Sequence, residues 1–98
     1  MIHKIFSVYD TKAKAYLAPF FMHQEGMAAR VFTNMVNDPN KSHQFSMNPE
    51  DYTLFVVGQW DDETCIFETR VPETLGNGLE YIDGKISNDP PVLTGTEG

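Results

Sequence analysis

Cysteine is almost absent from this chain, and its scarcity limits how the fold can be held together. The 98 residues include one cysteine, Cys65. An internal disulfide is therefore excluded, and the domain must depend on an apolar core. Cys65 alternates with Phe67 and Val71 on an apolar face. This pattern predicts a buried core cysteine in a reducing compartment rather than a reactive thiol.

Long hydrophobic runs and a leader segment are also lacking. No apolar run approaches the about 20 residues that span a bilayer. The N-terminus does not have the charged-then-apolar layout of a signal peptide. We therefore expect a soluble protein of the cytoplasm with no membrane partner.

Positive charge is scarce as well. Seven Lys or Arg stand against fourteen Asp or Glu, which gives a net charge of −7. Because nucleic acid attracts proteins that carry many Lys and Arg, this balance argues against indiscriminate polyanion binding. The charge is uneven: residues 1–45 carry +2 and residues 46–98 carry −9. The two halves of the chain therefore present opposite signs.

What the chain does contain is a long apolar stretch around which the fold can be organised. Tyr52 to Trp60 is rich in β-branched and aromatic residues, and Thr64 to Val71 alternates after three acids. The pattern predicts two antiparallel strands joined by a short hairpin loop. Tyr52 to Val57 is apolar on both faces, which predicts an interior strand with something covering each side.

A second hairpin and a helix precede this stretch. Ile2 to Tyr9 and Lys14 to Met22 are predicted strands around a polar turn. Pro19 should break the second of them or confine it to a sheet edge. Glu25 to Asn37 has a helical apolar stripe, and Asp38-Pro39 should end that helix.

These segments predict one α+β domain over residues 1–82. We expect a mainly antiparallel sheet of about four strands in the order β-β-α-β-β, with the helix packed on one face. Pro72 to Ile82 favours a weak short helix or a final strand. Residues 83–98 have the composition of a flexible tail, disordered or strap-like.

The sheet face opposite the helix needs a cover of its own. The loop and C-terminal segment, a second copy of the chain, or a ligand would each bury it. We favour a homodimer through this face.

The polar motifs carry no catalytic or metal-binding signature. The three histidines lie at positions 3, 23 and 43 without a partner at zinc-ligand spacing. Asp61, Asp62 and Glu63 lack the ligand spacing of a calcium loop and are better explained as a solvated hairpin tip. We predict no enzyme activity, no metal and no cofactor.

The first hairpin combines cations with aromatic rings. Single-stranded nucleic acid is bound by such combinations, because cations follow the phosphates while rings stack on unpaired bases. The alternative is that the lysines only solvate a turn and the tyrosines pack at the sheet rim. The predicted nucleic-acid-binding residues are Lys4, Tyr9, Lys12, Lys14, Tyr16 and Arg30.

Several segments together carry a family resemblance. They are IFSVYDTKAKAYLAPFF (Ile5 to Phe21), VNDP (Val36 to Pro39), PEDYTLFVVGQWDDET (Pro49 to Thr64) and, more weakly, LGNGLEYI (Leu75 to Ile82). In these the chain resembles the small nonstructural protein of gokushovirus-type microviruses, which are tailless phages with circular single-stranded DNA genomes. The resemblance implies a non-capsid protein in the bacterial host cytoplasm. It also implies a role, through DNA binding, in the switch from double-stranded replication to single-stranded genome synthesis and packaging.

Two functions therefore remain open. The first is a non-enzymatic accessory protein of phage DNA replication or packaging that binds single-stranded DNA weakly through its N-terminal hairpin. The alternative is an interaction module whose acidic half docks on a phage replication or capsid protein, or on a host factor, without binding DNA.

Overall fold

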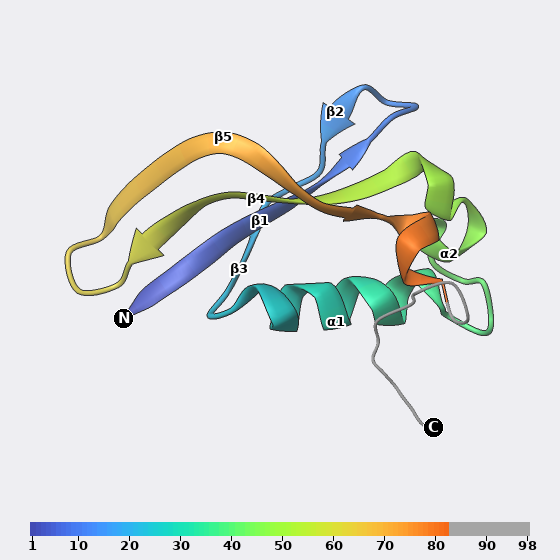
Figure 1. Cartoon of the computed structure of the whole chain (residues 1–98), viewed down its shortest axis with the longest axis horizontal. Helices are drawn as coiled ribbons and strands as arrows, with labels where there is room; N and C mark the ends of the chain where they lie inside the picture. The colour runs from blue at the N-terminus through green and yellow to red at the C-terminus, as the bar shows by residue number, and fades with distance from the viewer. Residues whose placement is uncertain (83–98) are drawn as a thin grey trace.

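The computed structural model describes residues 1–82 of the chain (Figure 1). The predicted tail at 83–98 lies outside the described residues, and the predicted domain division at that point stays a prediction. The elements in chain order are β1 (Ile2–Asp10), β2 (Ala15–Tyr16), β3 (Phe20–Met22), α1 (Glu25–Val36), α2 (Gln44–Met47), η1 (Pro49–Asp51), β4 (Tyr52–Asp61), β5 (Ile66–Asn77) and η2 (Gly78–Tyr81).

The strands form one curled antiparallel sheet in the order β2-β1-β4-β5, and β3 also pairs with β1. This confirms the predicted α+β class. β4 lies between β1 and β5, as its two apolar faces predicted. Tyr52, Leu54 and Val56 of β4 are buried, and the alternate residues of the strand point to the opposite side of the sheet.

Helix α1 covers one face of this sheet, and the core lies between them (Figure 1). Ala28, Phe32 and Val36 recur every four residues along α1 and are buried against Phe6 and Leu54. The helix ends one residue before its predicted end, where the Asn37 backbone N–H donates to the Thr33 carbonyl oxygen at 3.0 Å. Within residues 1–82, no helix has the length and apolar character needed to cross a membrane.

The predicted strand from Lys14 to Met22 is interrupted at Pro19. β2 and β3 lie on either side of the interruption and both pair with β1. Proline has no backbone N–H to donate to a ladder. The break is held in place by Leu17, whose N–H donates to the Val8 carbonyl at 2.8 Å and whose carbonyl accepts from the Ser7 hydroxyl at 2.7 Å.

The predicted core position of Cys65 is wrong. β4 and β5 pair from Asp61 and Ile66, so residues 62–65 form the hairpin loop. Cys65 closes that loop with φ 60° and is exposed. A tight hairpin loop commonly needs a left-handed residue at this point, and this requirement overrides the alternation with Phe67.

The last strand is longer than predicted and is irregular in the middle. β5 continues to Asn77, where an Asn77–Glu80 capping box starts η2. Val57 of β4 faces three residues of β5 at positions 70–72, because Val56 pairs with Glu73 and Gly58 pairs with Thr69. This bulge pushes the middle of the edge strand outward, and Val71 is 86% exposed.

Candidate nucleic-acid interface

The strand register assigns each paired residue to one face of the sheet, since partners on neighbouring strands point to the same side. The face opposite α1 is called the open face. Its register positions are His3, Ile5, Ser7, Tyr9, Tyr16, Phe21, Thr53, Phe55, Gly58, Trp60, Phe67, Thr69, Thr74 and Asn77. None of these positions is Asp or Glu. Glu68 and Glu73 of β5 pair with Gln59 and Val56 on the other face.

One end of the open face carries three packed aromatic rings, the tyrosine cluster. The Tyr9 and Tyr16 ring centroids lie 4.9 Å apart, and those of Tyr16 and Phe55 lie 5.5 Å apart, both in edge-on arrangements. Tyr16 lies in the middle and is 46% exposed. Its side chain therefore offers a preformed aromatic surface to solvent.

The turn beside this cluster carries two lysines. The Asp10 carboxylate accepts the backbone N–H groups of Lys12 and Ala13 at 3.0 and 3.2 Å, and the Lys14 N–H donates to the Asp10 carbonyl at 2.8 Å. Lys14 has a left-handed φ of 57°. The Lys12 ammonium lies 3.7 Å from the Asp51 carboxylate, whose side chain is only 13% exposed. Lys14 is exposed and forms no ion pair within residues 1–82, so its ammonium group is the freer of the two cations at this end of the sheet.

The six predicted binding residues thus fall on two sides of the protein. Tyr9, Tyr16, Lys12 and Lys14 lie together as described above. Lys4 belongs to the helix face and pairs with Glu25 at 3.6 Å. Arg30 is exposed on α1, beyond the opposite face of the sheet. The structure therefore separates Lys4 and Arg30 from the other four, and binding by any of the six stays a prediction.

A second aromatic group, missed by the sequence reasoning, lies at the other end of the open face. Phe21, Trp60 and Phe67 form the tryptophan cluster, with ring centroids 5.8 to 6.3 Å apart. His3 lies 5.1 Å from Trp60, and His23 lies 4.6 Å from His3. The apolar residues after Pro19 indicate a strand, but the sequence does not show which β1 residues they pair with, because this register depends on the length of the interruption at Pro19.

A shallow hollow of about 390 Å³ lies beside Tyr16 of the tyrosine cluster. Ser7 and Val57 form its floor on the two central strands, and Tyr16 and Pro72 lie at its sides. On the open face, aromatic ring surfaces therefore lie beside a depression.

A second cavity, of about 370 Å³, opens on the helix side between α1 and the segment from 17 to 22 and has an almost wholly apolar lining.

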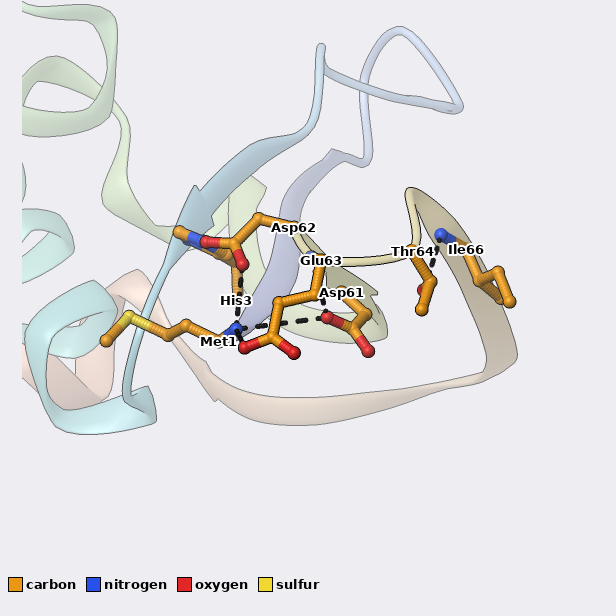
Figure 2. A network of polar contacts seen from close by, with 7 residues as sticks. All are labelled: Met1, His3, Asp61, Asp62, Glu63, Thr64 and Ile66. Carbon is orange, nitrogen blue, oxygen red and sulfur yellow. Dashed lines mark hydrogen bonds and ion pairs between the residues drawn. The ribbon is translucent and has the colours of Figure 1, made fainter.

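The acidic hairpin loop is tied to the start of the chain (Figure 2). The Met1 amino group donates to the Asp62 carboxylate at 2.7 Å, and His3 Nε2 lies 2.8 Å from the same carboxylate. These contacts, the amino group first, lower the pKa of Asp62, and the Asp62 hydrogen bond raises the pKa of the Met1 amino group. Within residues 1–82, no three His, Cys, Asp or Glu side chains are grouped so as to hold a metal ion.

Comparison with known proteins supplies the family. No curated protein and no solved structure matches the chain. A family model described as Phage ORF5 protein matches residues 3–81, a range that includes both aromatic clusters and the turn with Lys12 and Lys14, the lysine turn. The chain therefore belongs to the Phage ORF5 protein family.

Proposed function

We propose that this phage protein binds single-stranded DNA on the open face of its sheet. In this proposal it is a non-enzymatic accessory protein of viral DNA replication, or of single-stranded genome synthesis and packaging, in the host cytoplasm. The resemblance to gokushovirus-type microviruses supports a single-stranded genome. The observation that carries the proposal is the exposed tyrosine cluster beside the lysine turn.

The physical argument rests on what unpaired bases need. An aromatic ring stacks on any base, and each such contact is worth about 1 to 3 kcal/mol. Tyr16 offers a ring held by Tyr9 and Phe55, so little conformational freedom is lost on binding. Lys12 and Lys14 add cations at one end. The register positions of the open face include no Asp or Glu, which keeps carboxylates off the surface of the sheet itself.

The aromatic contribution is tested with a matched pair of variants. Tyr16→Ala should weaken binding of a labelled oligothymidylate by about 5- to 150-fold, which corresponds to one lost stacking contact. Met27→Ala removes a side chain of similar exposure, 47% against 46%, on α1, and should leave the affinity unchanged. Fluorescence anisotropy measures both. Equal affinities for Tyr16→Ala and the unmodified protein would refute the proposed site.

The cationic contribution is tested by salt dependence. Each phosphate contact contributes about −0.7 to the slope of log affinity against log salt for single strands. Replacing Lys12 and Lys14 by Gln should therefore make the slope shallower by about 1.4. The control replaces Arg30 and Lys41, which are also exposed and form no ion pair within residues 1–82. Identical slopes for the two double variants would mean that Lys12 and Lys14 make no phosphate contacts of their own, and that DNA responds only to the net charge of the protein.

A second copy of the chain is the competing occupant of the open face. The favouring observation is the exposed apolar surface of Phe21 and Phe67, since contiguous surface of this kind marks interaction sites. A homodimer through this face predicts sedimentation as a dimer at micromolar concentration and dissociation when DNA is added. A monomer throughout removes this candidate.

The acidic surface favours a protein partner as a further alternative. Glu63, Glu68 and Glu73 are exposed on and beside β5, and a basic surface of a phage replication or capsid protein would complement them. Capture of such a partner from infected cells that survives nuclease treatment supports this alternative. Loss of the partner with nuclease supports DNA as the ligand.

A further inference from the structure

The tryptophan cluster exposes large aromatic side chains to solvent. Phe67 is 56% exposed although its ring contacts both Trp60 and Phe21. The indole Nε1 of Trp60 is buried and has no hydrogen-bond partner within residues 1–82. A buried donor without an acceptor is unfavourable, by about 1 to 3 kcal/mol. The cluster is thus both solvent-facing and incompletely satisfied.

We infer that the tryptophan cluster is a second nucleobase-stacking site, occupied by the same DNA strand that contacts the tyrosine cluster. This inference rests on the proposed function and extends it to a defined path. The ligand is a base several nucleotides away from the one on Tyr16. Phe67 and Trp60 supply the stacking surface, and Phe21 holds them in position from β3.

The spacing of the two clusters suits a short single strand. Tyr9 belongs to the first cluster and His3 adjoins the second, six positions apart on β1. At about 3.3 Å per residue this is about 20 Å. A stacked strand advances about 3.4 Å per nucleotide, so about six nucleotides connect the clusters. That length falls within the about 4 to 16 nucleotides that comparable single-strand sites cover.

The surface between the clusters leaves this path open. Ser7, on the floor of the hollow, lies between Tyr9 and His3 on β1, and the lining of the hollow is mainly apolar. The acidic loop at 61–63 borders the far end and repels phosphates, although Asp62 is engaged by the Met1 amino group and His3. The bound strand should therefore end at the tryptophan cluster rather than continue past it.

Trp60 is the single tryptophan of the chain, so its emission reports on this cluster alone. A ten-nucleotide oligothymidylate should change Trp60 emission over the same concentration range in which anisotropy of a labelled copy reports binding. A three-nucleotide oligothymidylate is too short to reach both clusters and should bind at least 10-fold more weakly. Tyr16→Ala should weaken binding of the long oligonucleotide but leave the emission change at saturation in place.

Two neighbouring residues of β5 provide matched variants. Phe67 and Ile66 are 56% and 57% exposed, and the register places them on opposite faces of the sheet. Phe67→Ala should weaken binding of the ten-nucleotide strand by about 5- to 150-fold. Ile66→Ala should leave it unchanged. Circular dichroism establishes that each variant is folded, and the Trp60 measurement needs no variant at all.

The outcomes separate this inference from the proposed function. Binding seen by anisotropy with unchanged Trp60 emission overturns the second site and leaves the first in place. No binding by either readout overturns both. Trp60 emission that responds to protein concentration without DNA, and not to DNA, overturns the inference in favour of a second copy on the cluster.

Discussion

At Gly58 the backbones of β4 and β5 approach each other closely, and adding one methyl group there should disturb the hairpin. A Cβ atom at this position would lie 2.3 Å from the Glu68 carbonyl oxygen and 3.1 Å from the Thr69 Cα. Both neighbours are backbone atoms, so no side chain can rotate away. Gly58→Ala therefore requires the two strands to separate where Gly58 pairs with Thr69.

Forced overpacking of this kind costs about 1 to 3 kcal/mol, and we expect the upper part of that range because only backbone can move. For a domain of this size, 1 kcal/mol shifts Tm by about 4 to 8 °C. Gly58→Ala should therefore lower Tm by about 8 to 24 °C in a thermal melt followed by circular dichroism. Trp60 emission of the folded variant should also change, because the Trp60–Phe67 pair lies two residues from the clash.

Gly26 provides the matched control. It lies in the first turn of α1, and a Cβ atom there would meet nothing within 4 Å. Gly26→Ala should therefore stabilise the protein by about 0.5 to 1 kcal/mol through helix propensity. If Gly58→Ala melts at or above the temperature of the unmodified protein, the backbones of β4 and β5 do not approach closely enough at Gly58 to exclude a methyl group.

Two further predictions concern the β4–β5 loop. The exposed Cys65 thiol should be alkylated under native conditions without unfolding of the protein; protection until unfolding would return Cys65 to the core. Cys65→Gly should add about 1 kcal/mol of stability because φ at this position is 60°. The pKa of the Asp62 carboxyl should lie below its value in the unfolded chain because the Met1 amino group and His3 stabilise the charged form. The contacts of the charged Asp62 carboxylate stabilise the fold fully above the unfolded-state pKa, and this stabilisation is lost as pH falls through the lower folded-state pKa. An NMR titration that gives Asp62 a pKa no lower in the folded than in the unfolded chain, or a pKa that His3→Ala leaves unchanged, contradicts this prediction.

Much of the fold follows from hydrophobic period and proline. Tyr52 to Val57 predicted an interior strand because both its faces are apolar, and β4 lies between two strands. The helical stripe predicted α1 to within one residue of its end. Cys65 was placed wrongly because alternation cannot show where a hairpin loop stops. A loop one residue longer moves that position from a strand to a left-handed turn residue.

The candidate site was predictable only where it is local in sequence. Tyr9 and Tyr16 flank one short turn, so a hairpin brings them together in any reasonable register. The tryptophan cluster joins residues from β3, β4 and β5, and it depends on the break at Pro19 setting Ile5 opposite Phe21. Lys4 and Arg30 were grouped with the others by charge alone, because the sequence does not show which side of the sheet each residue meets.

The three-residue bulge at positions 70–72 decides how copies of this protein can meet. An edge strand as long as β5 would ordinarily be a template for another strand, with the risk of open-ended aggregation. Here the outward arch interrupts the row of free amides and carbonyls, and Pro72 lacks an amide hydrogen. Growth of the sheet from this side is therefore disfavoured. Contact between broad surfaces such as the open face is then favoured over the addition of a strand along β5.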